Sequence, residues 1–291
     1  MIINKNKWNY LLLCLKKTIL RKGFNCPSCG SDKKDHISRK YFVTALKRCN
    51  KCQLLFRVPS TTHNENNQFY QNSYNEGYTT DFPNETILKK LISSKFINSN
   101  RDYSCYINIL NAIGAKRGSK VIDFGCSWGY GSWQFRNQKY NVDSYEISKP
   151  RRNYAAKKLG ANIITDLSKI NNYYDYFFSS HVLEHVPSIE SIVELAKKNT
   201  RNKGFFLAFT PNGSSDYRTT KNSSWNKLWG QVHPNFLDSI YYKNLFKKYR
   251  YYISSSPYDI GSIRKWYLGK LPNQSCFLNG GDELLVIVKF S

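Results

Sequence analysis

The chain has 291 residues, of which 41% are hydrophobic and 22% charged, so its composition excludes a disordered or fibrous protein. The formal net charge is +24, and half of it lies in the first 60 residues, which hold 14 Lys and Arg against two Asp. No basic run is interleaved with regularly spaced aromatic residues, so the sequence does not indicate a specific nucleic-acid module. An anionic small molecule, such as a nucleotide-linked sugar, is compatible with this charge.

Residues 1–22 form a basic N-terminal segment. Apolar residues at positions 8, 11, 12, 15 and 19, with lysines between and around them, predict an amphipathic helix. The apolar stretch 10–15 is too short to span a bilayer and is followed by no signal-peptide cleavage site, which favours a cytoplasmic location. The helix either makes a peripheral contact with an anionic membrane or packs against the zinc ribbon or a second subunit. The second interpretation is favoured.

Four cysteines define the next region, residues 23–60. Two residues separate the members of each pair and 19 separate the pairs, which is the spacing of a zinc ribbon: Cys26, Cys29, Cys49 and Cys52. Four thiolates complete a tetrahedral shell around Zn²⁺, so this metal is expected to be structural. Disulfides or unrelated cysteines are the alternative, which a cytoplasmic location disfavours. The apolar runs 37–46 and 54–58 predict the short strands of the ribbon.

Residues 61–101 are expected to form a linker followed by a helix. Tyr70, Tyr74 and Tyr78 recur at four-residue spacing, so they either line a ligand pocket or pack as one face of a helix. Helical periodicity covers 86–96. A second domain then begins at residue 102, opening with a helix predicted over 104–113.

The most informative segment is 120–133, where an apolar strand runs into a glycine-rich turn and then a helix. Gly125 and Gly129 let the backbone approach a ligand with no Cβ in the way, and the helix presents free N–H groups, so the segment predicts a nucleotide-cofactor loop. A second strand ends in Glu146, where a carboxylate can accept both hydroxyls of a ribose. A third strand ends in Asp166. A fourth, 174–180, runs directly into the sequence His-Val-Leu-Glu-His-Val.

Over residues 102–291 these motifs resemble the class I S-adenosylmethionine-dependent methyltransferases. The stretch 121–129 matches the strand-and-loop motif of that family, with Ser127 in place of the middle glycine, and the His-Val-Leu-Glu-His-Val run is similar to the family motif after the fourth strand. The resemblance implies an α/β fold, a Rossmann-like seven-stranded sheet with an antiparallel last strand at 282–290, preceded by the small zinc ribbon. It also implies a set of residues that hold S-adenosylmethionine: Asp123, Gly125, Ser127, Gly129, Glu146, Asp166 and His181. Within this set Glu146 would bind the ribose and Asp166 the adenine amine.

A four-cysteine ribbon directly before such a domain is similar to deoxysugar C-methyltransferases and related enzymes of surface-polysaccharide gene clusters. The resemblance therefore implies a sugar or glycan methyltransferase of polysaccharide biosynthesis, whose acceptor atom is oxygen, carbon or nitrogen. Two alternatives stay open: an RNA methyltransferase, which the ribbon and the +24 charge could serve, and a catalytically inactive scaffold of the same fold.

Removal of a proton from the acceptor suits a histidine near neutral pH. The resemblance to sugar methyltransferases places a catalytic histidine in the segment 229–236, which holds His233. His233 is therefore the first candidate base, and the alternative is that it caps the following helix or only binds substrate. His185 is the second candidate, although Glu184 and His185 alternatively hold the loop beneath the cofactor. The sequence specifies neither the acceptor nor the oligomeric state.

Overall fold

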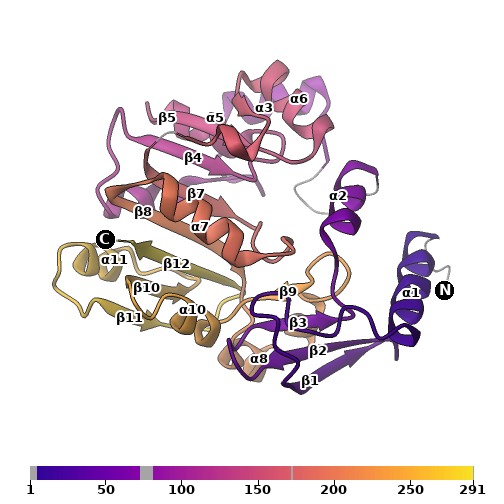
Figure 1. Ribbon diagram of the computed structural model, residues 1–291. Coiled ribbons are helices and arrows are strands. Elements are labelled where there is room, and N and C mark those ends of the chain that lie inside the picture. The colour runs from indigo at the N-terminus through magenta and orange to yellow at the C-terminus, as the bar shows by residue number, and fades with distance from the viewer. Residues whose placement is uncertain (1–4, 73–80, 172, 291) are drawn as a thin grey trace.

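In the computed structural model, residues 5–72, 81–171 and 173–290 are described, and they form two sheets with flanking helices (Figure 1). Tyr74 and Tyr78 lie outside these ranges, as does the middle of the expected linker. The elements before the large sheet are α1 (Lys5–Ile19), β1 (Lys34–Lys40), β2 (Thr44–Cys49), β3 (Leu55–Val58), α2 (His63–Asn72), α3 (Glu85–Ser93) and α4 (Ser104–Ala112).

The second part of the chain alternates strands and helices. Its elements are β4 (Lys120–Phe124), α5 (Tyr130–Asn137), β5 (Asn141–Tyr145), α6 (Lys149–Leu159), β6 (Asn162–Ile164), the 3₁₀ turn η1 (Leu167–Lys169), β7 (Tyr174–Ser180), α7 (Ile189–Asn199) and β8 (Thr200–Pro211). They are followed by α8 (Ser215–Thr220), α9 (Asn222–Lys227), β9 (Asn235–Phe236), α10 (Ser239–Leu245), β10 (Arg250–Ser255), α11 (Ile260–Tyr267), β11 (Gln274–Phe277) and β12 (Glu283–Lys289).

The large sheet has the strand order β11-β10-β12-β8-β7-β4-β5-β6. Strands β4 to β8 pair in parallel, and β12 lies antiparallel between β8 and β10. The expected Rossmann-like sheet with an antiparallel last strand is thus confirmed, but it has eight strands where seven were expected. The extra strand is β11, which pairs with β10 at the edge of the sheet. Its sequence, Gln-Ser-Cys-Phe, has no apolar run that would have indicated a strand.

Buried side chains cover both faces of this sheet, because successive strand residues point to opposite sides. Along β4, Ile122 and Phe124 enter one apolar core while Val121 enters the other. The first core also receives side chains from α7 and α10, and the second receives them from α4, α5 and α11. The domain is therefore a three-layered sandwich in which the sheet is buried on both faces, as parallel sheets require.

The small sheet has the order β1-β2-β3-β9, so its last strand comes from the long segment between β8 and α10 (Figure 1). Leu55 pairs with Phe236 and Phe56 with Asn235 in antiparallel register. An apolar cluster joins the same two parts of the chain through buried side chains: Leu46, Leu55, Tyr217, Trp225, Trp229 and Phe236. The four-cysteine region is therefore integrated with the segment that follows β8.

Helix α1 lies against β3 and α2 by one face only. Tyr10 and Cys14 face Arg57, and Lys17 forms an ion pair of 2.5 Å with Glu65. The opposite face carries an exposed apolar stripe: Trp8, Leu12, Leu15 and Ile19. Among the described residues no helix has the length and apolar character needed to cross a membrane.

Candidate functional site

The site is built where two loops leave adjacent strands of the large sheet. Strand β4 pairs in parallel with β7, so the loop 125–129 after β4 and the loop 181–186 after β7 emerge at the same edge. The strand order changes direction at this point, because β4 begins the branch toward β6 and β7 begins the branch toward β8. In open α/β sheets, ligands bind in the crevice at such a switch point.

The first loop depends on glycine at both ends. Gly125 has φ +87°, and a Cβ built on it would lie 2.2 Å from Cγ2 of Val182 in the second loop. Gly129 has φ +88°, and its Cβ would lie 2.8 Å from Cβ of Ala155 in α6. Glycine is required at both positions by conformation and by space. The two loops are therefore in direct contact.

Ser127, the residue that departs from the family motif, adopts φ 52° within this loop. Its Oγ is buried and accepts or donates no hydrogen bond among the described residues. A buried hydroxyl without a partner is unusual and indicates that a ligand supplies the missing contact. The loop thus presents its backbone and the Oγ atom of Ser127 to a bound molecule. Both features fit a nucleotide cofactor.

Three acids were predicted at the cofactor, and each follows or ends a strand. Asp123 is buried at the end of β4, where it accepts a 2.6 Å hydrogen bond from Ser132 of α5, and burial raises its pKa to about 7. Glu146 follows β5 and accepts the backbone N–H groups of Ser127 and Ser148 at 2.9 and 2.8 Å. Its carboxylate is therefore joined to the glycine loop.

Asp166 follows β6 and is exposed. It accepts the backbone N–H of Ser168 at 2.9 Å, and these contacts with Ser168 lower the pKa of its carboxyl group. The structure thus brings Gly125, Ser127, Gly129 and Glu146 together and places Asp166 at the end of the outermost strand of this branch.

The second loop begins with His181, whose φ of 54° is rare for a residue with a side chain. Such backbone strain gathers at functional sites. The Nδ1 atom of His181 lies 3.3 Å from Oε1 of Glu184, and its Nε2 lies 3.9 Å from Oε1 of Glu283. Burial lowers the pKa of His181, but these carboxylates outweigh it and raise the pKa to about 9, so this imidazole is cationic at neutral pH.

Glu184, His185 and His233 meet beside His181. One ligand atom from each of the three lies within 4.8 Å of the others, and the two imidazole rings are 4.6 Å apart between centroids. Glu184 is fully buried, and neither of its carboxylate oxygens accepts a hydrogen bond from the part of the chain that the structure describes. Burial raises the pKa of Glu184, but the cationic His181 beside it opposes this effect, and the pKa of the carboxyl group is lowered.

Both candidate bases have a defined tautomer. Nδ1 of His185 lies 2.8 Å from the backbone oxygen of Val232, and Nδ1 of His233 lies 2.6 Å from that of Leu228. A carbonyl only accepts, so each Nδ1 carries the proton and each Nε2 is the basic nitrogen. Burial lowers the pKa of His185 to about 4 and also lowers the pKa of His233. Both rings are therefore neutral near pH 7.

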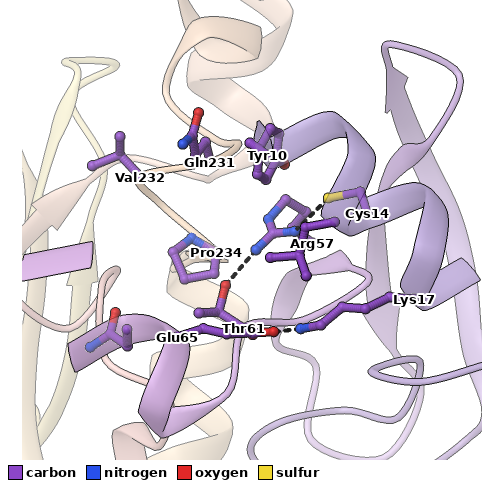
Figure 2. A pocket seen from close by; sticks show the side chains of 11 residues that line it. Tyr10, Cys14, Lys17, Arg57, Thr61, Glu65, Gln231, Val232 and Pro234 are labelled. Carbon is purple, nitrogen blue, oxygen red and sulfur yellow. Dashed lines mark hydrogen bonds and ion pairs between the residues drawn. The ribbon is translucent and has the colours of Figure 1, made fainter. Parts of the chain in front are cut away.

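The segment 231–235 is held by contacts from both sheets. Asn235 donates its side-chain amide to the backbone oxygens of Leu183 and Val186, at 3.4 and 2.6 Å, and so ties β9 to the second loop. On the other side, the N–H of Arg57 in β3 donates to the oxygen of Pro234 at 2.8 Å. Figure 2 shows the resulting pocket, in which 231–234 forms one wall and α1 the opposite wall.

Sequence reasoning missed Lys40, which comes from β1 of the small sheet. Its Nζ lies 4.3 Å from the ring centroid of Trp229 and donates to the backbone oxygen of that residue. Burial lowers the pKa of Lys40 to about 8, and its charge helps to lower the pKa of His233. No local signal marks this lysine, because only the pairing of the two sheet segments brings it to the histidines.

The four cysteines also converge. Sγ atoms of Cys26 and Cys52 are 3.5 Å apart, and those of Cys29 and Cys49 are 3.4 Å apart. Disulfide sulfurs lie about 2.05 Å apart, so these are four thiols. Four thiolates at about 2.3 Å from a tetrahedral Zn²⁺ would be separated by about 3.7 Å. The cluster therefore fits a structural metal ion without rearrangement.

This cysteine cluster packs on the large domain. Cys26 and Cys49 belong to the same apolar core as residues of α7 and α10. Arg48 forms a 2.6 Å ion pair with the buried Asp238, and Asn244 donates to the backbone oxygen of Cys52 at 3.0 Å. The region of the four cysteines therefore contacts the large domain at two places, around the cysteines themselves and at β9.

Solved structures with a similar fold were found by comparison. The plantazolicin methyltransferase BpumL in complex with SAH has a TM-score of 0.49 and 13% identity, over 77% of this chain and 93% of that one. A TehB-like SAM-dependent methyltransferase from Corynebacterium glutamicum has a TM-score of 0.46 and 14% identity, over 70% and 94%. A SAM-dependent methyltransferase from Archaeoglobus fulgidus has a TM-score of 0.43 and 16% identity, over 69% and 99%. No curated protein matches the chain.

A family model described as a methyltransferase domain matches residues 97–255, which is more than half of the chain. The matched region contains the glycine loop, the three acids and the histidine cluster described above. The chain belongs to this family and is a class I S-adenosylmethionine-dependent methyltransferase.

Proposed function

We propose that the protein transfers the methyl group of S-adenosylmethionine to a sugar or nucleotide-linked sugar during glycan biosynthesis. The observation that carries this proposal is the cluster of Glu184, His185 and His233 beside the glycine loop, with the partly buried cation of Lys40 next to it. The cluster offers a centre for proton removal, and Lys40 offers a charge for an anionic acceptor.

The cofactor would be held by the residues around the first loop. Gly125, Ser127 and Gly129 form the turn, and Glu146 is joined to it through the N–H of Ser127. In this proposal Glu146 binds the ribose, Asp166 contacts the adenine, and Asp123 supports the loop from beneath through Ser132. His181 would lie between the cofactor and the acceptor. S-adenosylmethionine supplies an activated methyl group when it is bound.

The task of the remaining residues is to orient the acceptor and to take up its proton. The neutral imidazoles of His233 and His185 present Nε2 as the basic atom, so either suits proton removal. We propose His233 as the first candidate because its loop is held by the ribbon, which also supplies Lys40. The sugar class is supported by the arrangement of the ribbon before the methyltransferase domain and by this cationic edge.

Zinc would be bound by Cys26, Cys29, Cys49 and Cys52 with a structural role, because four thiolates leave no open position. All eight cysteines are thiols, which suits a reducing compartment such as the cytoplasm. We also propose that α1 contacts an anionic membrane surface through Trp8 and the exposed leucines, since Lys16, Arg21 and Lys22 lie exposed beside them. Lipid-linked glycans would then be accessible to the enzyme.

Methyl-labelled S-adenosylmethionine tests the proposed activity. The purified protein is incubated separately with a panel of nucleoside-diphosphate sugars and with total RNA, and the labelled product is identified by mass spectrometry. Label in a sugar nucleotide supports the proposal, and label in RNA alone contradicts it.

The His233→Ala variant is measured in the same assay. If His233 removes the acceptor proton, turnover falls by about 10²–10⁴-fold while affinity for S-adenosylhomocysteine is unchanged. The exposed His36, replaced by Ala, is the matched control. Normal turnover of His233→Ala would show that this histidine is not the base.

A further inference from the structure

The carboxylate of Glu184 is buried without the hydrogen-bond donors that normally stabilise such a group. It is fully buried, yet neither oxygen accepts a hydrogen bond among the described residues. Its contact with His181, at 3.3 Å, is an ion pair to one oxygen from a half-exposed ring. A buried carboxylate without such bonds is costly unless a cation or several donors face it.

His185, on the other side of the carboxylate, presents a lone pair to it, and the ring of His233 lies beside that of His185. Because Nδ1 of each ring donates to a backbone carbonyl, Nε2 of each is an acceptor, and Nε2 of His185 lies 3.7 Å from Oε1 of Glu184. Two acceptor atoms therefore face each other at this distance. A positively charged group between them would be attracted by all three residues.

This arrangement has the features of a metal site. Metal-bound histidines almost always donate the second ring nitrogen to a carbonyl or carboxylate, which fixes the tautomer and aims the other nitrogen at the ion. Both His185 and His233 have this support, from the oxygens of Val232 and Leu228. The three ligand atoms lie within 4.8 Å of one another, and binding of one ion at about 2.0–2.2 Å would draw them together to about 3–3.6 Å.

We propose that Glu184, His185 and His233 bind one divalent transition-metal ion, separate from the ion of the cysteine cluster. Two imidazoles and one carboxylate leave coordination positions open, which distinguishes this site from the closed four-thiolate site. Imidazole ligands favour a first-row transition ion over Mg²⁺, which prefers oxygen ligands.

The role of this ion rests on the proposed function, although its binding does not. A hydroxyl of the acceptor would occupy an open position, where the ion lowers its pKa. The hydroxyl proton leaves to water, the oxygen forms a bond to the methyl carbon, and the bond from that carbon to sulfur breaks with its electrons remaining on sulfur. The sulfonium becomes a neutral thioether. The ion then does the work proposed above for His233 as base, and His233 holds the ion, so His233→Ala would lose turnover through loss of the ion.

Mn²⁺ is a suitable probe, because it has the lowest affinity in the series of divalent transition ions and does not displace zinc from thiolates. The full-length protein, carrying one equivalent of zinc per chain for the cysteine cluster, is titrated with Mn²⁺ while the electron paramagnetic resonance signal of the free ion is followed. The wild type is expected to bind one Mn²⁺ per chain. His185→Gln and His233→Ala are each expected to weaken this binding by at least about 10–100-fold, the loss known for outer-shell partners alone. His36→Ala, in an exposed strand position, is expected to bind as the wild type does.

Binding of S-adenosylhomocysteine by the same samples, measured by calorimetry, shows that each variant is folded. Absence of Mn²⁺ binding in the wild type would overturn the proposed site. Mn²⁺ binding by both folded variants with the affinity of the wild type would overturn it as well. Full methyl transfer after chelation, with the zinc content unchanged, would overturn the role of the ion. Mn²⁺ binding without any methylated sugar product would leave the site in place and count against the proposed function instead.

Discussion

The two ends of the site differ in how they are built. The proposed cofactor end lies between residues 121 and 146, and its key feature is a turn with positive φ at Gly125, Ser127 and Gly129. The proposed acceptor end joins Lys40 from the small sheet, Glu184 and His185 from the loop after β7, and His233 from the segment before β9. The first is determined by local backbone chemistry, and the second depends on contacts between distant parts of the chain.

This difference has a functional consequence. A cofactor loop that depends on its own backbone and on one neighbouring strand should tolerate changes elsewhere in the chain. The histidine cluster should instead be sensitive to the ribbon, because β3 and β9 hold the segment that carries His233. The two ends should therefore respond separately to substitution.

Loss of the cysteine site should give the largest effect. Cys49→Ser should remove zinc, unfold the small sheet and release the segment 228–236, so turnover should fall by about 10²-fold or more, as for loss of a positioned proton acceptor. Metal analysis and the methyl-transfer assay measure these changes. Cys105→Ser, which alters an exposed thiol, is the control. Normal turnover in zinc-free protein would separate the ribbon from catalysis.

Glu146→Ala should act on the opposite end. Removal of a charged acceptor of hydrogen bonds should weaken binding of S-adenosylhomocysteine by roughly 1.5–3 kcal/mol, which calorimetry measures. The exposed Glu85, replaced by Ala, should leave the affinity unchanged. If both variants bind equally well, Glu146 does not contact the ribose.

Gly125→Ala tests the contact between the two loops. The new methyl group would meet Val182, so stability should fall by about 1–3 kcal/mol more than in Gly118→Ala, as expected for overpacking. Gly118 is the matched control, because it also has positive φ, +84°, but open space around its Cβ position. Thermal or urea unfolding measures both variants. Val182→Ala in the Gly125→Ala background should restore part of the loss, and absence of any rescue would argue against this contact.

Lys40→Met should have the smallest effect and should change only the KM for the acceptor. Loss of one cation near an anionic acceptor should raise its KM by about 3–10-fold without altering cofactor affinity, consistent with about 1 kcal/mol for a partly exposed charge pair. The pKa of Lys40 is lowered to about 8, so its charge is lost as pH rises through 8. The KM of the wild type should therefore increase between pH 7 and 9. Lys40→Arg should abolish that increase, and an unchanged KM in Lys40→Met would exclude the contact.

Much of the fold could be predicted from the sequence, because strands and helices alternate with clear periodicity and the glycine loop is a local motif. The structure explains the glycines at 125 and 129, because both positions have positive φ and neither has space for a Cβ atom. The edge strand β11 could not be predicted, because its four residues have no apolar pattern. The expected cysteine cluster is present, since the paired spacing itself brings the thiols together.

The acceptor end was only partly predictable. His185 and His233 could be singled out as candidates, but nothing local shows that they meet, or that Glu184 lies between them without hydrogen bonds. Trp225 and Trp229, which flank the segment before His233, are buried in the core shared with the small sheet. Lys40 reaches Trp229, four residues before His233, only because β1 belongs to the sheet that β9 completes. Such placements depend on tertiary pairing, which a single sequence does not encode locally.

Hydrogen–deuterium exchange with and without S-adenosylhomocysteine tests the separation of the two ends most directly. The ligand should slow amide exchange in residues 121–148 and in the adjoining loop 181–186, because Gly125 contacts Val182. Exchange in residues 26–60 and 228–236 should be unchanged, since in our proposal the ribbon and the His233 segment serve the acceptor. Protection of the ribbon or of 228–236, with no change in 121–148, would contradict the assignment of the glycine loop as the cofactor site.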